Sequence, residues 1–252
     1  MIQTIKKQLK KNINVLLFDE VESTNNICKE IGKNNFETTL VSASYQTGGR
    51  GRLGRNFISL KDKGIYMSLL IKPNISIDDI SKVTCVVGCS IHKVLKEYLK
   101  CDLYVKWVND IYLNNYKVCG ILTESKVVNG NLQYLIIGMG INLYSQEFPS
   151  DIIASSIEDQ TNIIINKEDL IAKIVNQVLI DLDDINNQEH VDYFKKHMYL
   201  KNEVVLLNIR GTEHICKILD INENFELMAL INNEIINISS GEILKVSKIR
   251  GN

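Results

Sequence analysis

The sequence lacks the features that mark several large classes of protein. No run of about eighteen apolar residues occurs, so we expect no membrane-spanning helix. The 29 basic and 30 acidic residues leave a net charge of −1, without the basic excess that is typical of general nucleic-acid binders. The first residues, MIQTIKKQLKKNINVLLF, contain only a short apolar run and no small-residue cleavage site. We therefore expect no targeting segment and a cytoplasmic location.

Metal-binding and disulfide patterns are missing as well. The six cysteines form no CxxC pair and the four histidines form no HExxH motif. Neither a zinc site nor a disulfide framework is predicted, and reduced thiols in a cytosol fit best. Cys85 and Cys89 are four residues apart and would share one face of a helix. They allow a metal pair, but buried structural thiols are the interpretation that we prefer.

The 252 residues, 45% hydrophobic and 23% charged, suffice for one large domain or for a large and a small one. The patterns predict an α+β body up to about residue 200. Its expected elements are strands at 13–21, 39–47 and 64–73, helices at 23–33, 76–100, 168–184 and 188–199, a hairpin around 114–115 and a turn at 129–131. Beyond it, short strands separated by RGT, NEN and NN predict a small β-barrel, so we divide the chain into domains 1–200 and 201–252.

The stretch YQTGGRGRLGR (45–55) is the most unusual one, because four glycines and three arginines fall within eight of its residues. Glycines let successive N–H groups point into one concavity, which forms an anion-binding nest. Arginines add forked donors that fit phosphate or carboxylate oxygens. The loop therefore predicts a phosphate-handling site. A flexible surface loop and an RNA-binding loop are the alternatives that the loop alone leaves open.

Three further segments are ambiguous when each is considered alone. In VKWVNDIYLNNYKVCGIL, Lys117 is either a solvated flank or a group that neutralises a substrate carboxylate while an acyl phosphate forms. Asp110 in the same segment is either a turn residue or an oxygen ligand of magnesium. The motif GMGIN (138–142) indicates a bulge or a close approach of backbone to a ligand, and STN (23–25) indicates a helix N-cap or a contact residue.

Together and in this order, the segments STN, YQTGGRGRLGR, KWVNDIYLNNYKVCGIL and IGMGIN closely resemble the biotin protein ligase family, the biotin–[acetyl-CoA carboxylase] ligases. The resemblance runs from about residue 15 to the end. It implies a mixed-sheet body like that of class II synthetases, followed by an SH3-like β-barrel. It also implies an enzyme that forms biotinyl-5′-AMP from biotin and ATP with Mg²⁺ and then transfers biotin to a lysine of a biotin carboxyl carrier protein. The Gly/Arg loop would order over the adenylate and donate to its phosphate.

The resemblance also implies roles for individual residues. The expected biotin contacts are Ser23, Thr24, Asn25, Gln46, Gly49, Arg50, Gly51, Arg52, Lys117, Gly120 and Leu122. The expected contacts to ATP or the adenylate are Arg50, Arg52, Arg55, Lys106, Asn109, Lys117 and Asn142. Lys117 and Arg52 would be catalytic, and Asp110 would hold Mg²⁺. The sequence departs from the family at Val108, Phe57 and Cys119, and Lys245 would replace an arginine of the barrel.

Partners and rival functions follow from the same resemblance. Only a dozen or so residues precede the first expected strand, too few for the winged helix-turn-helix of bifunctional members, so we expect no operator-DNA binding. Family members pair through a sheet edge, which leaves a homodimer open. The rivals are a lipoate or octanoate ligase or transferase, whose relatives lack the GRGRxGR loop, and a nucleic-acid-binding module, which the scarcity of interleaved aromatics opposes. A carrier-binding protein without catalysis is opposed by the intact Arg50, Arg52 and Lys117.

Overall fold

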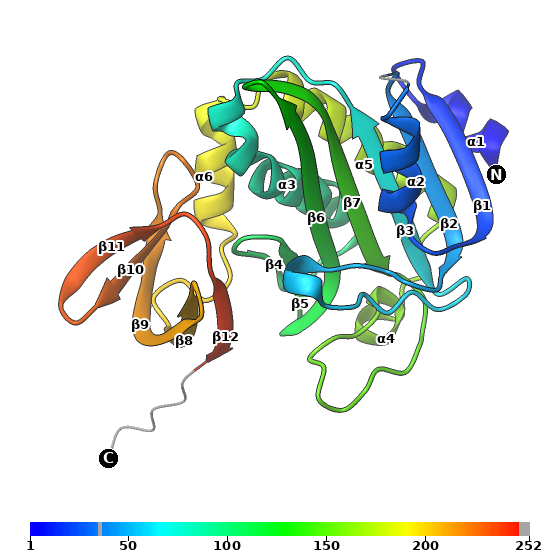
Figure 1. Ribbon diagram of the computed structural model, residues 1–252. Helices are drawn as coiled ribbons and strands as arrows, with labels where there is room; N and C mark the ends of the chain where they lie inside the picture. The colour runs from blue at the N-terminus through cyan, green and yellow to red at the C-terminus, as the bar shows by residue number, and fades with distance from the viewer. Residues whose placement is uncertain (35–36, 247–252) are drawn as a thin grey trace.

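The computed structural model describes residues 1–34 and 37–246, except for the side chains of 245 and 246. The predicted role of Lys245 and the last six residues of the predicted second domain therefore lie outside the described residues. The described part contains a seven-stranded mixed sheet and a separate five-stranded antiparallel sheet (Figure 1). In spatial order, the strands of the large sheet are β1 (Asn14–Val21), β2 (Thr39–Gln46), β3 (Gly64–Ile71), β7 (Asn131–Asn142), β6 (Tyr116–Val128), β5 (Asp110–Leu113) and β4 (Leu103–Lys106).

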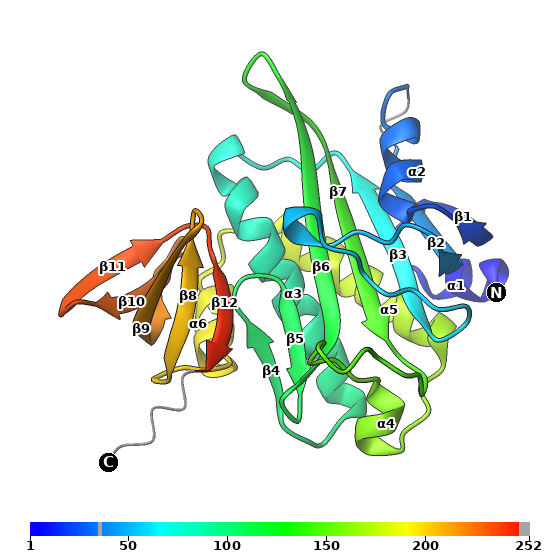
Figure 2. The same ribbon diagram turned by 60° about the horizontal axis from the view of Figure 1, so that its bottom comes forward.

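The large sheet is mixed because β1 and β2 pair in parallel, whereas its other neighbouring strands pair antiparallel. β3 lies inside this sheet, and all eight of its residues are buried. Helix α2 (Thr24–Ile31) lies on one face of the sheet, and α3 (Ile80–Tyr98) and α5 (Lys167–Asp183) lie on the other (Figures 1 and 2). A strand covered on both faces is expected to be a continuous apolar run, which GIYMSLLI is except for Ser68.

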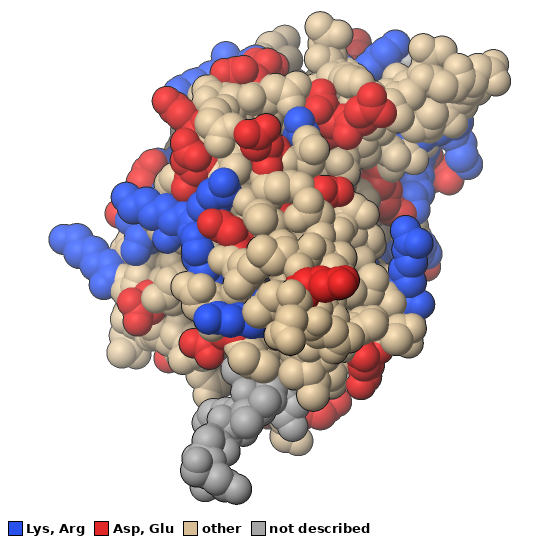
Figure 3. Space-filling view, turned by 90° about the vertical axis from the view of Figure 1, so that its left-hand side faces the viewer, with Lys and Arg blue, Asp and Glu red and all other residues tan. Residues whose placement is uncertain are grey.

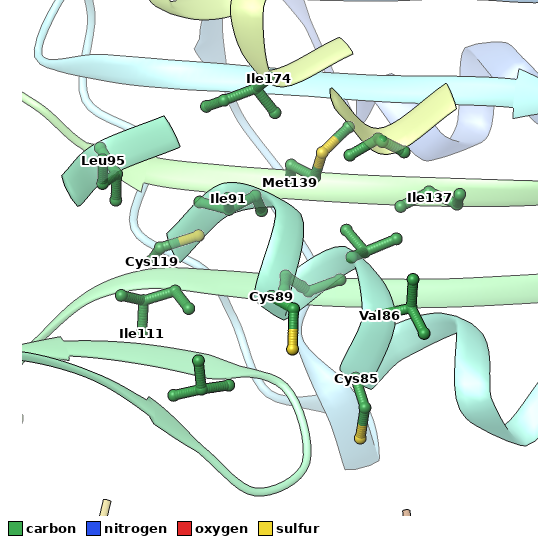
Figure 4. Close-up of a cluster of buried hydrophobic side chains, with 14 of the residues drawn as sticks. Cys85, Val86, Cys89, Ile91, Leu95, Ile111, Cys119, Ile137, Met139 and Ile174 are labelled. Atoms are coloured by element: carbon green, nitrogen blue, oxygen red, sulfur yellow. The ribbon is translucent and has the colours of Figure 1, made fainter. Parts of the chain in front are cut away.

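The main core lies between α3, α5 and the sheet (Figure 4). Cys85 and Cys89 are fully buried on α3, where burial raises the pKa of both thiols, that of Cys89 to about 12. The two cysteines are thus buried thiols, as we preferred from the sequence. No group of three or more His, Cys, Asp or Glu side chains that could hold a metal ion occurs among the described residues.

The predicted helices and turns are confirmed, with differences at their ends. α3 follows a short 3₁₀ turn, Ile77–Asp79, in which the Ser76 hydroxyl accepts from the Asp78 N–H. Ser23 occupies the N-cap position of α2, as the sequence indicated, but its side chain makes no capping hydrogen bond among the described residues. Three further helices are α1 (Ile2–Gln8), α4 (Ile157–Thr161) and α6 (Gln188–Lys196), of which α1 and α4 were not predicted.

The turns 114–115 and 129–130 connect neighbouring strands of the large sheet. Asn114 and Asn115 have φ of 48° and 71°, and Asn129 and Gly130 have φ of 50° and 73°. Two consecutive residues with positive φ are typical of the tight turns that match the twist of a hairpin. The Asn-Asn and Asn-Gly pairs therefore set the register of β5 with β6 and of β6 with β7.

The small sheet packs directly against the large one. Its strands are β8 (Val204–Ile209), β9 (Thr212–Ile221), β10 (Leu227–Ile231), β11 (Glu234–Ile238) and β12 (Glu242–Val246), in the order β11-β10-β9-β8-β12. The Trp107 indole N–H donates to the Phe225 carbonyl over 2.8 Å, and the rings of Phe194 and Phe225 meet edge to face. Buried residues of both sheets belong to one hydrophobic cluster. A separate small β-sheet at the C-terminal side of the chain is confirmed, while the division into two domains at residue 200 stays a prediction.

Two further findings concern membrane crossing and surface charge. Among the residues that the structure describes, no helix combines the length and the apolar character needed to cross a bilayer. Figure 3 views the molecule from the side of the small sheet and shows positive and negative side chains interspersed over that face.

Candidate functional site

A cavity of about 560 Å³ opens between the start of α2, the Gly/Arg loop, the strands β5, β6 and β7, and the start of β12. Most of the predicted site residues line it, although they come from segments that are far apart in the chain. The predicted residues at its wall are Ser23, Thr24, Asn25, Gln46, Arg50, Gly51, Arg52, Arg55, Lys106, Asn109, Asp110, Lys117, Gly120 and Leu122. Nine of them form two sets, which we call the neutral group (Ser23, Thr24, Asn25 and Gln46) and the cationic group (Arg50, Arg52, Arg55, Lys106 and Lys117).

The neutral group is held by hydrogen bonds that are buried or partly buried. Gln46 Oε1 accepts from the Thr24 N–H over 2.8 Å, and Gln46 Nε2 donates to Ser59 Oγ over 2.9 Å. Ser68 Oγ lies 2.6 Å from Thr24 Oγ1 and donates to Asn25 Oδ1 over 2.5 Å. Ser68 is fully buried and was not predicted as a site residue, although a lone polar residue in an apolar strand was visible in the sequence. These bonds fix the orientations of the Thr24, Asn25 and Gln46 side chains before any ligand binds.

Glycines give the cavity a flat floor. Gly120 on β6 pairs with Gly140 on β7, so two positions without a side chain lie next to each other. A Cβ atom built at Gly140 would come within 2.5 Å of the Phe57 ring, and one at Gly120 within 3.2 Å. Phe57 therefore lies directly against this floor, and it keeps an aromatic ring at the position where tryptophan is usual in the family that the sequence resembles.

The Gly/Arg loop has a defined conformation. The Gly51 N–H donates to the Arg55 carbonyl over 2.7 Å, and the Phe57 N–H donates to the Gly49 carbonyl over 2.9 Å. At the tip, Leu53 has a φ of 56° and is 77% exposed. The loop is thus a small hairpin whose apolar tip faces solvent, and its arginines extend from a fixed backbone.

Three side chains of the cationic group are bonded to three consecutive residues, Gly241 and the first two residues of β12. Arg52 Nη2 donates to the Gly241 carbonyl over 3.4 Å, and Lys106 Nζ donates to the Ile243 carbonyl over 3.2 Å. Between these two contacts, the Arg55 guanidinium pairs with the carboxylate of Glu242. Residues 241–243, which we call the acceptor segment, thus supply oxygen atoms to cations that were predicted to bind phosphate.

Lys117 and Asp110 lie side by side in the cavity, with 2.7 Å between Nζ and Oδ1. The two atoms are in ion-pair contact without the alignment of a hydrogen bond, and Asp110 Oδ1 is buried without a hydrogen-bond donor among the described residues. Lys106 is close by, and burial lowers the pKa of its amine, an effect that the charge of Asp110 opposes. The cavity therefore places two lysine ammonium groups beside the half-buried carboxylate of Asp110.

Two predicted residues do not reach the cavity wall. Gly49 is buried, and a Cβ atom there would collide with the Phe57 carbonyl and with Ser59 Oγ, so its role is to let the backbone pack closely. Asn142 is 3% exposed and donates through Nδ2 to the Ser155 carbonyl over 3.2 Å, while its Oδ1 has no partner among the described residues. Their contacts to a ligand stay predictions.

Comparison with known proteins identifies the family to which the chain belongs. A sequence model of the biotin/lipoate A/B protein ligase family matches residues 17–142, half of the 252 residues. The chain belongs to the biotin/lipoate A/B protein ligase family. Within it, the chain is similar to the bifunctional ligase/repressor BirA of Bacillus subtilis, with 32% identity over 166 residues, 64% of this chain and 51% of that protein.

Two further similarities agree with the resemblance seen in the sequence. The biotin–[acetyl-CoA-carboxylase] ligase of Paracoccus denitrificans is 29% identical over 126 residues, 48% of this chain and 51% of that protein. The chain thus spans about half the length of these curated relatives. The structure of biotin protein ligase from Aquifex aeolicus in complex with biotin and ATP has a TM-score of 0.78 and 26% identity, over 92% of this chain and 99% of that one. The predicted resemblance and fold class are confirmed.

Proposed function

We propose that this protein is an ATP-dependent biotin protein ligase. It forms biotinyl-5′-AMP and pyrophosphate from biotin and ATP, and it then transfers biotin to a specific lysine of a biotin carboxyl carrier protein. One observation carries the proposal: a single cavity holds both the neutral group and the cationic group. An acid with an uncharged polar head needs the first group for recognition, and its reaction with a nucleotide needs the second group for charge stabilisation.

In the first step, a carboxylate oxygen of biotin forms a bond to the α-phosphorus of ATP, and the bond from that phosphorus to pyrophosphate breaks. Lys117 is catalytic in this proposal, because its ammonium lies in the cavity and lowers the repulsion between the carboxylate and the phosphate. Arg52 is the second catalytic residue. Arg50, Arg55 and Lys106 bind phosphate oxygens together with Arg52, and charged hydrogen bonds to phosphate replace the bonds to the acceptor segment.

In the second step, the amine of the carrier lysine forms an amide bond with the acyl carbon, AMP leaves with its oxygen, and the amine loses a proton. The cavity must therefore admit a lysine side chain from a folded partner. A relative named biotin–[acetyl-CoA-carboxylase] ligase supports a biotin carboxyl carrier protein as this partner. The cytoplasmic location belongs to the proposal, and the absence of operator-DNA binding and the homodimer stay predictions.

Magnesium also belongs to the proposal, with Asp110 as its protein ligand. The buried Oδ1, which has no hydrogen-bond donor within the described part of the chain, fits a hard cation, and Mg²⁺ commonly takes one carboxylate together with substrate phosphates and water. When bound, Mg²⁺ supplies positive charge that neutralises the phosphates. The ion pair of Asp110 with Lys117 supports a second role for the same carboxylate, which is to hold the lysine in place.

Pyrophosphate exchange into ATP, measured with biotin, with lipoate and with neither acid, tests this function. We expect exchange that requires biotin and that falls by at least about a hundredfold in Lys117→Ala, as for removal of one charge-stabilising group. Lys126→Ala is the matched control, because Lys126 lies on the same strand, is exposed and does not line the cavity. A second assay follows the transfer of labelled biotin to a purified carrier domain.

The rival functions give different results in these assays. Exchange with lipoate alone would assign the chain to the lipoate branch of the family. Exchange with biotin but no transfer to any carrier domain would leave only the first step standing. Exchange with neither acid would contradict the proposal and return attention to RNA binding, whose affinity would fall steeply with salt.

A further inference from the structure

The neutral group is connected to a charged pair outside the cavity wall. Asn25 Nδ2 donates to Glu124 Oε2 over 2.8 Å, and Lys29 Nζ lies 2.6 Å from Glu124 Oε1. Lys29 is one turn beyond Asn25 on α2, and Glu124 is on β6. Neither charged residue is among those that line the cavity, and neither was predicted from the sequence. The contact therefore reaches the cavity only through Asn25.

The charge of Glu124 determines which group donates in each hydrogen bond that links Asn25, Ser68 and Thr24. A carboxylate can only accept, so the amide nitrogen of Asn25 must face it and Oδ1 must face the other way, towards Ser68. Ser68 then donates its single proton to Asn25 Oδ1, over 2.5 Å. Because that proton is used, Thr24 must donate its own proton, either to Ser68 Oγ at 2.6 Å or to Gln46 Oε1 at 3.1 Å.

With the donors assigned in this way, the Thr24 hydroxyl can act as an acceptor towards the cavity. Its hydroxyl proton is used inside the network, so Oγ1 has a lone pair for a ligand N–H. The Asn25 side-chain amide lies directly against Gly138 of β7, where a Cβ atom would come within 2.3 Å of Oδ1. The amide group is thus held against β7. A half turn about the Cβ–Cγ bond of Asn25 is the rearrangement that would exchange Oδ1 with Nδ2 and reverse the donor and acceptor pattern.

We propose that Glu124 is a positioning residue that fixes the donor and acceptor pattern of the neutral group through Asn25, Ser68 and Thr24. The inference rests on the proposed function, because the ligand it favours has an N–H group at the end held by Thr24, as the cyclic urea of biotin has. Glu124 touches no substrate. It acts by making one of the two amide orientations of Asn25 unfavourable, and Lys29 holds its carboxylate on the correct side.

The first test requires no ligand. In the Glu124→Gln variant the new side chain can donate as well as accept, so Asn25 is free to adopt both orientations. We expect the side-chain amide proton signals of Asn25, assigned in the NMR spectrum through Asn25→Asp, to shift and to exchange faster with solvent in Glu124→Gln. Glu30→Gln is the matched control, because it removes an ion pair of the same 2.6 Å length from the exposed side of α2. It should leave these signals in place.

The second test measures how the pattern is used. Binding is compared between biotin and an analogue whose two urea nitrogens are replaced by oxygen, which gives a cyclic carbonate without N–H groups. Wild type and Glu30→Gln should prefer biotin strongly, and Glu124→Gln should lose about tenfold of that preference. Ser68→Ala interrupts the network beyond Asn25, so it should lose a similar factor of the preference for biotin. The Asn25 amide should keep its hydrogen bond to Glu124 in this variant. In exchange assays, Glu124→Gln should raise the KM for biotin and leave the KM for ATP unchanged.

The outcomes distinguish the positioning role of Glu124 from the proposed function of the protein. Asn25 signals that are unchanged in Glu124→Gln would overturn the positioning role, whatever the ligand. An unchanged preference for biotin in Glu124→Gln would overturn it as well, and so would a parallel rise of both KM values with a lower thermal midpoint, because that is a structural defect. If the Asn25 signals shift but wild type binds no biotin, the positioning role stands and the proposed function fails.

Discussion

Acid should destabilise the protein through His92, a fully buried residue on α3. Its Nε2 lies 2.8 Å from the Leu103 carbonyl and its Nδ1 lies 2.8 Å from the Tyr193 hydroxyl. A carbonyl only accepts, so Nε2 carries the proton of the neutral ring and Nδ1 accepts from Tyr193. The pKa of His92 is lowered from 6.5 to about 4, chiefly by burial and to a lesser extent by His197 and Lys96, while the hydrogen bond to the Leu103 carbonyl opposes the shift.

The sign and size of the effect follow from these pKa values. Between pH 6.5 and about 4 the unfolded chain binds a proton that the folded chain does not, so the free energy of unfolding falls as the pH falls through this window. At about 1.4 kcal/mol per pH unit, the lowering from 6.5 to about 4 amounts to about 3 kcal/mol. The contribution of His92 is fully present above pH 6.5 and fully lost below about pH 4.

Urea unfolding at closely spaced pH values between 7.5 and 4 measures this loss. The His92→Gln variant cannot titrate, so its stability should fall less than that of wild type by about 3 kcal/mol over the window. His197→Gln is the control for the neighbouring ring, whose pKa is also lowered by burial. Parallel pH curves for wild type and His92→Gln would refute the reasoning, since the buried neutral ring would then contribute nothing to acid sensitivity.

Three further predictions concern packing and backbone. Gly140→Ala should cost about 1–3 kcal/mol of unfolding free energy in a urea titration, because its Cβ would lie 2.5 Å from the Phe57 ring; Phe57→Leu in the same chain should restore part of it. Trp107→Phe leaves the buried Phe225 carbonyl without its donor and should lower the free energy of unfolding by about 1–3 kcal/mol in calorimetry. An unchanged thermal midpoint would contradict this and would mean that another donor replaces the indole N–H. Gly130→Ala should cost about 1–2 kcal/mol and Gly130→Asn clearly less, because only the positive φ of 73° is at issue in open space; equal thermal midpoints for the two would contradict this.

The elements that the sequence predicts well are those whose signal is local. The apolar run GIYMSLLI and the Asn-Asn and Asn-Gly turns depend on a few adjacent residues, and β3 and both hairpins lie where expected. Helix α1 was missed because its sequence, IQTIKKQ, is short and basic and buries a single side chain, Ile5. That burial depends on packing against α5, which no local pattern reports.

The same distinction holds for the site. The motifs around Thr24, Arg52 and Lys117 were visible because the residues of each motif are adjacent in the sequence, and resemblance to a family assigned their expected roles. Glu124 and the acceptor segment were not predicted, because what matters is which atoms they face. The ion pair of Glu124 joins two elements 95 residues apart, and the contact of Arg52 with Gly241 joins residues 189 apart. Only the folded chain shows these partners.

The contacts of the acceptor segment also bear on how the chain matures as it is synthesised. Arg52 and Arg55 are made early, but their partners Gly241 and Glu242 follow 189 and 187 residues later. Contacts of such long sequence separation form late, because the intervening chain must first be ordered. On the ribosome, the large sheet can be complete in sequence while its arginines still face water or a passing anion. The charge balance of the cavity is therefore one of the last features that a nascent chain acquires, and it is acquired from the final strand.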